Sequence, residues 1–126
     1  MSDPLDEVEA GFHLKLPPRH RAALLDVNDP IHACTILLRS EGDATIFSVN
    51  QGERASDWRE WPDYLVAFAY DGCFGLFAYD TRQEPYRVYY IDPLESATES
   101  VTNCETEGYV FRTFDDWYAN QLSGDA

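Results

Sequence analysis

The sequence predicts an α+β fold with a mixed, largely antiparallel β-sheet flanked by N- and C-terminal helices. Apolar residues recur at helical spacing near both ends, and several short apolar runs separated by polar turns lie between them. The clearest pair of runs lies in residues 61–81, around an Asp-Gly turn. Helices at the ends and strands in the middle are typical of an α+β fold. The chain of 126 residues is expected to be one domain, 1–126, with its core over about residues 12–122.

Two helices are expected before residue 30. The first starts after a cap at Ser2 or Asp3, with Pro4 at the first helical position, where its missing N–H costs little. The second follows Pro17 and Pro18 and ends at Asn28-Asp29-Pro30. The residues expected to pack inward are Leu5, Val8 and Phe12 in the first helix and Leu16, His20, Ala23, Leu24 and Val27 in the second.

The middle of the chain predicts two hairpins. The runs 33–39 and 44–50 read as two strands around a turn at Glu41 and Gly42, and 51–57 reads as a loop. Trp58 and Trp61 suit one helical turn or a packed loop. Pro62 then leads into the second hairpin, whose two runs surround the Asp-Gly turn.

Another strand and a helix complete the predicted fold. Residues 86–92 have apolar side chains at alternate positions on both faces, which favours a strand inside the sheet. We expect a mobile loop over 93–108 and a short closing strand over 108–114. A last helix is expected to be capped by Thr113, to end at Gly124 and to pack through Phe114, Trp117, Tyr118 and Leu122.

The charge of the chain restricts its partners. With 23 acidic against 9 basic residues, the formal net charge is −14. Nucleic acid and anionic membranes repel such a protein, whereas a basic protein attracts it, although the charge can equally serve solubility. The three cysteines, Cys34, Cys73 and Cys104, are expected to be buried free thiols in a reducing compartment. The acidic N-terminus is unlike a signal peptide, so a cytoplasmic localisation is expected.

Enzyme, metal and cofactor sites have little support in the sequence. His32 and Cys34 form one close pair of metal-ligand types without a second pair, so no zinc site is expected, and His20 is predicted to be a packed core residue. Cys73 lacks a neighbouring base, and the segment DGCFG lacks the further residues of a phosphate-binding loop. Carboxylate pairs carry no information in so acidic a chain. We therefore predict no catalytic residue, cofactor or metal.

Aromatic and acidic residues suggest a binding surface instead. Tryptophan and tyrosine often anchor protein interfaces, and carboxylates beside them suit a basic partner. The residues predicted to form such an interface are Asp57, Trp58, Glu60, Trp61, Asp63, Tyr86, Tyr89, Asp92 and Glu95.

The order of these segments resembles the SUKH superfamily of Smi/Knr-type domains. Leu16-Pro17, followed by His20, Leu24 and Asn28, resembles its Leu-Pro, aromatic, Leu, Asn-Gly signature. Residues 61–80 resemble its central strand, Asp-Gly turn and second strand, and YRVYYID and RTFDDWYANQL resemble its next strand and final helix. His20 stands where the family has an aromatic residue. Asp29-Pro30 replaces Gly-Gly, and Cys73-Phe74 replaces polar or small residues.

The resemblance implies an α+β fold and a non-enzymatic role. Bacterial members are commonly immunity proteins that bind and neutralise a cognate toxin, often a nuclease, and fungal relatives are regulators of cell-wall signalling. The leading hypothesis is an immunity protein for a basic, nuclease-type toxin. The alternatives are a regulatory scaffold with a non-toxin partner and a small enzyme that uses Cys73 or a carboxylate pair.

Overall fold

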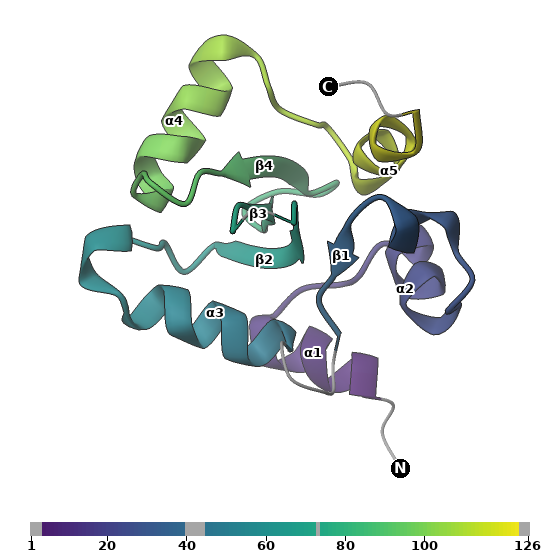
Figure 1. Cartoon of the computed structure of the whole chain (residues 1–126). Helices are drawn as coiled ribbons and strands as arrows, with labels where there is room; N and C mark the ends of the chain where they lie inside the picture. The colour runs from purple at the N-terminus through teal and green to yellow at the C-terminus, as the bar shows by residue number, and fades with distance from the viewer. Residues whose placement is uncertain (1–3, 40–44, 73, 124–126) are drawn as a thin grey trace.

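The protein has an antiparallel sheet with helices on both sides (Figure 1). The computed structural model describes residues 4–39, 45–72 and 74–123, and the structural statements below refer to these. Its elements are α1 (Pro4–Phe12), α2 (Pro18–Leu25), η1 (Pro30–Ala33), β1 (Ile36–Leu37), α3 (Ile46–Ala55), η2 (Asp57–Arg59), β2 (Leu65–Tyr70), β3 (Leu76–Asp80), β4 (Arg87–Ile91), α4 (Ala97–Glu107) and α5 (Phe114–Ser123). The predicted α+β fold is therefore confirmed.

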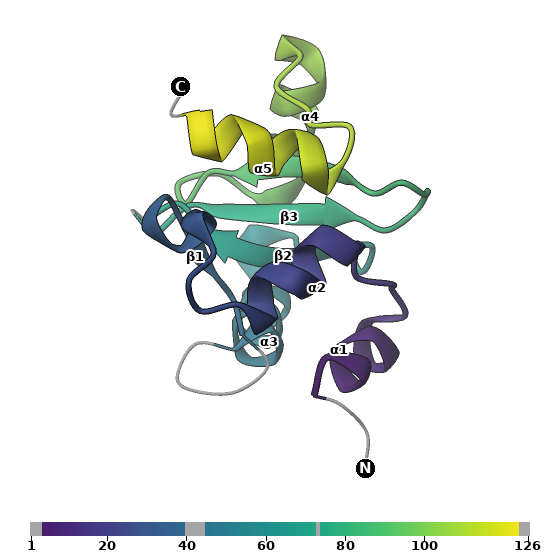
Figure 2. The same cartoon turned by 90° about the vertical axis from the view of Figure 1, so that its right-hand side faces the viewer.

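The four strands follow one another across the sheet in the order β1-β2-β3-β4, and every neighbouring pair is antiparallel. The predicted central hairpin is formed by β2 and β3, with Leu65 opposite Asp80 and Tyr70 opposite Leu76. α2 and α5 lie on one face of this sheet, in front of the strands in Figure 2, and α3 and α4 lie on the other face, to the left of the strands in Figure 1. Within the described ranges, no helix combines the length and apolar character needed to cross a membrane.

Aromatic rings form the centre of the core. His20 is fully buried and stacks on Phe114, with ring centroids 4.8 Å apart and an interplanar angle of 8°. Phe68 stacks on Tyr79 at 4.3 Å and meets the edge of Trp117 at 5.0 Å. α2, the central hairpin and α5 are thus joined through one cluster, which confirms His20 as a packed core residue.

The predicted hairpin over 33–50 is wrong. Within its described parts, 33–39 and 45–50, the strand is limited to Ile36–Leu37, and the helix α3 begins at Ile46. The Thr45 side chain accepts a hydrogen bond from the Ser48 amide, and the Ser48 hydroxyl accepts one from the Thr45 amide. This reciprocal capping box starts a helix in residues whose β-branched character favours a strand. The expected turn at Glu41 and Gly42 lies outside the described residues.

The two predicted loops are also mostly helical. α3 continues through residue 55 of the expected loop 51–57, and α4 occupies most of the expected mobile loop 93–108. The Ser96 hydroxyl accepts from the Glu99 amide at the start of α4, and Gly108 ends the helix with a positive φ of 79°. Both are standard helix end signals. The sequence did not predict α4, because the apolar periodicity of residues 93–108 is weak.

The strand β4 is an edge strand of the sheet, so the prediction that it is an interior strand is wrong. Its apolar residues on both faces are explained by helices, because α4 packs on one face and α5 contacts the other. The predicted closing strand over 108–114 is reduced to one antiparallel bridge between Val88 and Phe111. This bridge lies along the outer edge of β4.

Several smaller expectations have mixed outcomes. Leu5, Val8, Leu16 and Ala23 are buried as predicted, whereas Val27 lies beyond α2 and is 73% exposed. The Thr113 hydroxyl accepts from the Asp116 amide and caps α5, but Leu122 is exposed. The expected caps Ser2 and Asp3 and the expected stop at Gly124 lie outside the described residues.

The cysteines differ from one another. Cys104 is a buried free thiol, as predicted, and burial raises its pKa. Cys34 is free but exposed, so the prediction that it is buried is wrong. Cys34 is the residue directly after the short helix η1. Cys73 lies outside the described residues, and its proposed role as a nucleophile is untested.

Candidate functional site

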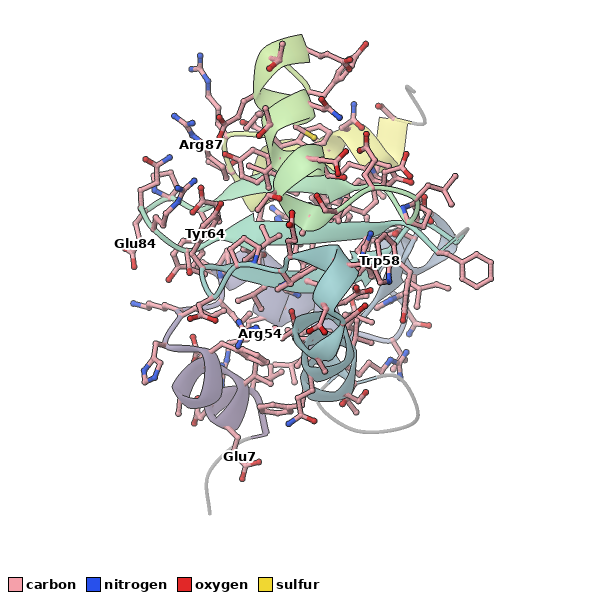
Figure 3. The ribbon with its side chains drawn as sticks, turned by 90° about the vertical axis from the view of Figure 1, so that its left-hand side faces the viewer. Glu7, Arg54, Trp58, Tyr64, Glu84 and Arg87 are labelled. Carbon is pink, nitrogen blue, oxygen red and sulfur yellow. The ribbon has the colours of Figure 1, made fainter. Side chains whose placement is uncertain are left out.

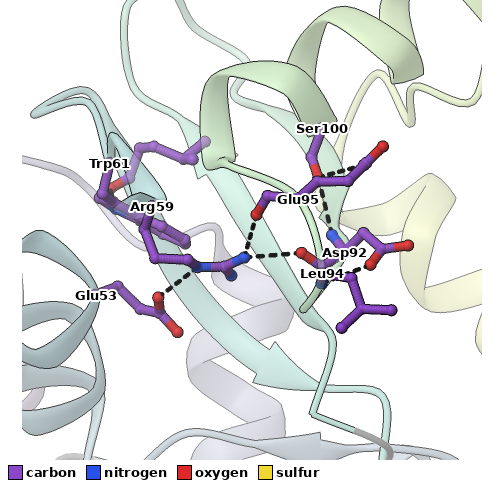
Figure 4. A network of polar contacts seen from close by, with 8 residues as sticks. Glu53, Arg59, Trp61, Asp92, Leu94, Glu95 and Ser100 are labelled. Carbon is purple, nitrogen blue, oxygen red and sulfur yellow. Dashed lines mark hydrogen bonds and ion pairs between the residues drawn. The ribbon is translucent and has the colours of Figure 1, made fainter. Parts of the chain in front are cut away.

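A buried arginine organises the surface between η2 and α4. The Arg59 side chain is only 4% exposed and donates to the Glu53 carboxylate at 2.8 Å. It also donates to the backbone carbonyls of Asp92 at 2.8 Å and Glu95 at 2.5 Å (Figure 4). A planar guanidinium has five donors in fixed directions, so it can satisfy several acceptors at once. Arg59 therefore joins α3, η2 and the β4–α4 loop.

Two tryptophans complete this arrangement. The Arg59 guanidinium lies 5.1 Å from the Trp58 ring centroid and 5.8 Å from that of Trp61. Trp61 is buried and donates its indole N–H to the Leu65 carbonyl at 2.8 Å. Trp58, in contrast, is 59% exposed. One tryptophan thus anchors the segment to the core, and the other is presented to solvent.

The β4–α4 loop has its own hydrogen bonds. The Asp92 carboxylate accepts from the Leu94 amide at 2.8 Å, and the Ser100 hydroxyl accepts from the Asp92 amide at 2.9 Å. The same Ser100 hydroxyl donates to the Glu95 carboxylate at 2.9 Å. These bonds fix a tight turn whose outermost side chain is Leu94, which is 89% exposed. A leucine this exposed on an ordered turn is available to a partner.

The tip of the central hairpin lies at the same end of the sheet. Because Leu76 pairs with Ile91, the residues just before β3 lie beside those just after β4. Asp71 accepts from the Gly75 amide at 3.0 Å and from the Tyr90 hydroxyl at 2.7 Å, which holds the tip in place. Phe74 is 85% exposed there, and its φ of 74° is unusual for a residue with a side chain.

We define the Trp58 surface as three exposed apolar residues, each from a different segment, together with five nearby carboxylates. Its members are Trp58, Phe74 and Leu94, with Asp57, Glu60, Asp71, Asp92 and Glu95. Figure 3 shows Trp58 at one end of the sheet and Tyr64, Glu84 and Arg87 toward the other. Among the described residues of these three segments, the positive charge is that of Arg59, which is buried. The surface is therefore both apolar and negatively charged.

A cavity of about 320 Å³ adjoins the β4–α4 loop. The carboxylates of Asp92, Glu95 and Glu107 line it together with Tyr90 and Tyr109, and no lysine or arginine is among its lining residues. The Glu95 carboxylate accepts from Asn103 at 2.7 Å, which orients it along one wall. Such a cavity is suited to a lysine or arginine side chain of a partner.

The predicted interface residues divide into two groups. Asp57, Trp58, Glu60 and Asp63 are exposed, and Asp92 and Glu95 are half-buried, so the six are accessible to a partner. Their role in binding stays a prediction. The remaining three, Trp61, Tyr86 and Tyr89, are buried, and this corrects their assignment to a surface.

Each buried aromatic residue has an internal hydrogen bond that explains its position. The Tyr86 hydroxyl accepts from the Lys15 amide at 3.0 Å, and the Tyr89 hydroxyl donates to the Glu105 carboxylate at 2.8 Å. Strand alternation alone could not reveal this, because both faces of β4 are covered by helices. Phe74 and Leu94 were not among the residues predicted for the interface, because Phe74 follows the predicted turn and Leu94 lies in the segment expected to be a mobile loop.

The described residues offer no arrangement for metal chemistry. No group of three or more histidine, cysteine or acidic side chains among them is placed to hold a metal ion. His20 is surrounded by aromatic rings, and its Nδ1 shares a hydrogen bond of 2.7 Å with the Tyr79 hydroxyl. Burial lowers the pKa of His20 to about 3, so this imidazole is neutral at pH 7. It is a core residue and not a surface acid or base.

Comparison with known proteins identifies the family. No curated protein and no solved structure matches the chain significantly. The family model described as the SMI1 / KNR4 family (SUKH-1) matches residues 2–120, which is nearly the whole chain. The predicted resemblance to the SUKH superfamily is thereby confirmed, and the chain belongs to the SMI1 / KNR4 (SUKH-1) family.

Proposed function

We propose that this protein is a non-enzymatic binding domain that recognises a basic protein through the Trp58 surface. The observation that carries the proposal is the combination of exposed Trp58, Phe74 and Leu94 with carboxylates on segments held together by buried Arg59. Apolar anchors within a charged rim are typical of protein interfaces. A preformed surface also lowers the entropic cost of binding.

The partner favoured by this proposal is a basic, nuclease-type toxin, which the protein neutralises as an immunity protein by covering the toxin's active site. Membership of the SUKH-1 family is consistent with this role. The net charge of −14 supports it physically, because opposite charges accelerate the encounter of two proteins. We place this activity in the cytoplasm, where a reducing environment suits free cysteines.

A regulatory scaffold that binds a non-toxin partner is the second candidate. It uses the same surface, and family membership is equally consistent with it. The two candidates differ in consequence, because an immunity protein abolishes the activity of its partner, whereas a scaffold leaves that activity intact or redirects it. An activity assay of the bound partner therefore distinguishes them.

The test starts from the product of the adjacent upstream gene. We expect it to be captured by the tagged protein at moderate salt, and we expect Trp58→Ala to weaken the complex at least about tenfold in calorimetry because aromatic anchors dominate interfaces. Leu25→Ala is the matched control, since Leu25 is 67% exposed but lies on α2. Absence of binding contradicts the choice of partner. Binding that Trp58→Ala leaves unchanged contradicts the assigned surface.

A further inference from the structure

Two arginines stand directly opposite each other at the other end of the sheet. Val88 and Phe111 exchange both backbone hydrogen bonds of an antiparallel bridge, at 2.9 and 3.1 Å. In this geometry, the residue before one member lies opposite the residue after the other, and their side chains share a face. These residues are Arg87 and Arg112. Like charges placed opposite each other on paired strands destabilise the pairing.

Five of the other arginines have a charged or aromatic partner, and Arg39 is exposed like this pair. Arg21, Arg59 and Arg82 form ion pairs with carboxylates, and Arg19 and Arg54 lie over aromatic rings. Arg87 and Arg112 are exposed, and neither takes part in an ion pair with the described residues. The two arginines lack an ion pair although the chain has 23 acidic residues that could supply a carboxylate.

Both arginines line one cavity of about 690 Å³. Val110, Gly108 and Pro85 form apolar parts of its wall, and the remaining lining residues are Gln83, Glu84 and Glu105. Figure 3 shows Arg87 and Glu84 on the same side of the molecule. The Glu105 carboxylate accepts the hydrogen bond of the buried Tyr89 hydroxyl. The cavity thus presents, beside an apolar wall, two guanidinium groups without an ion-pair partner among the described residues, and that of Arg87 also donates to the Tyr89 hydroxyl.

We propose that Arg87 and Arg112 bind the carboxylate of a ligand in this cavity. Paired guanidinium groups match the planar, two-oxygen geometry of a carboxylate and relieve their own repulsion when it is bound. Glu84 and Glu105 in the same wall repel a ligand of high negative charge, which disfavours phosphate dianions and nucleic acid. The carboxylate belongs either to a small acid or to a peptide, and both sources share this chemistry.

A structural role for the arginines is the competing explanation. α4 ends at Glu107, beside this cavity, and its last turn contains no basic residue. Arginines near the negative end of a helix stabilise it. The two explanations predict opposite effects on stability, because a functional pair costs stability in the unbound protein whereas a helix-compensating pair contributes to it.

The binding test uses NMR of the arginine side-chain N–H groups. We titrate the protein with sodium acetate, with a short peptide that has a free C-terminal carboxylate, and with the amidated form of that peptide. We expect saturable shifts at Arg87 and Arg112 with a carboxylate probe but not with the amidated peptide or with inorganic phosphate at equal ionic strength. Acetate alone indicates a small acid, and the free peptide alone indicates a peptide ligand.

Variants of Arg112 distinguish carboxylate binding by the planar guanidinium group from attraction by positive charge alone. Arg112→Lys keeps the charge but loses the planar fork, so we expect binding to weaken about fivefold or more. Arg39→Lys is the control, because Arg39 is exposed and lies outside the cavity lining. Arg112→Gln should raise or preserve the melting temperature of the unbound protein. A clear decrease in this melting temperature overturns the proposal. NMR shifts that grow linearly with the carboxylate concentration, or that chloride produces equally, also overturn it. These outcomes do not depend on whether the Trp58 surface binds a protein.

Discussion

At the scale of single residues, two buried basic side chains, Arg59 and His20, have very different surroundings. The buried Arg59 guanidinium is stabilised in the interior by a carboxylate and two carbonyls that accept its hydrogen bonds. His20 has one polar contact among aromatic rings, so burial favours its neutral form. A buried charge is retained only where enough acceptors surround it. One residue organises a surface and the other fills the core.

Removal of Arg59 is expected to destabilise the protein strongly. Arg59→Ala leaves the Glu53 carboxylate uncompensated and two carbonyls without their donor, which costs about 3 kcal/mol of unfolding free energy. Urea denaturation measures the loss. Arg39→Ala, at an exposed position, is the matched control and should change stability by less than about 0.5 kcal/mol. Equal effects of the two substitutions would show that the Arg59 contacts contribute little.

His20 is expected to make the protein sensitive to mild acid. Burial lowers its pKa from 6.5 to about 3, so between these values the unfolded chain binds a proton that the folded chain does not. The unfolding free energy therefore falls as the pH decreases through this window, by at most about 1.4 kcal/mol per pH unit. His20→Phe should flatten the stability profile between about pH 6 and pH 4.5.

The window between about pH 6 and pH 4.5 lies above the pH at which two stabilising carboxylates, Asp29 and Asp80, are protonated. Burial raises the pKa of Asp29 and Asp80, but hydrogen bonds from the Ile31 amide and from Arg82 outweigh it, so both pKa values lie below 3.8. Their contribution to stability is lost only at lower pH. Leu25→Ala, at an exposed position without a titratable group, provides the control and should leave the slope unchanged. A slope that survives His20→Phe would assign the acid sensitivity to other groups.

At the scale of elements, the central hairpin combines regular pairing with a constrained tip. Its β2–β3 ladder has a register shift between Ala67 and Ala69, and Asn50 of α3 compensates there by accepting from the Ala67 amide and donating to its carbonyl. At the tip, Gly75 has no room for a side chain, because a Cβ atom would collide with the Tyr90 hydroxyl and the Asp71 carboxylate. The tip conformation thus depends on one glycine.

Two glycine substitutions are expected to have opposite effects. Gly75→Ala forces Tyr90 and Asp71 apart and should lower the unfolding free energy by about 2 kcal/mol, as overpacked sites typically do. Gly52→Ala places a methyl group in open space within α3 and should raise it by about 0.5–1 kcal/mol. Thermal denaturation of the two variants measures both. A stable Gly75→Ala protein would mean that the tip rearranges at little cost.

At the scale of the whole molecule, the two ends of the sheet have different chemistry. The Trp58 surface contains exposed apolar residues among carboxylates, whereas Arg87 and Arg112 lie at the end near Glu84. A net charge of −14 is therefore not spread evenly. Association with a basic partner should be oriented by this asymmetry, and salt should slow it by screening.

The sequence predicted the fold class and the central hairpin, because strict apolar runs around Asp-Gly have few other solutions. It missed α3 and α4, whose helical start depends on local caps at Thr45 and Ser96 that β-branched and polar residues obscured. For the candidate site, acidic positions were predicted as accessible more reliably than aromatic ones. Burial of a tyrosine depends on the helices that cover its strand, which no local pattern reveals.

The hydrogen bonds of Arg59 have a consequence for how specificity can diverge. They hold the η2 and β4–α4 segments through backbone carbonyls and one carboxylate, and not through the exposed side chains of Trp58 or Leu94. Those outer positions can therefore be exchanged by mutation while the segments keep their geometry. A domain built in this way can acquire a new partner through a few substitutions and still fold as before.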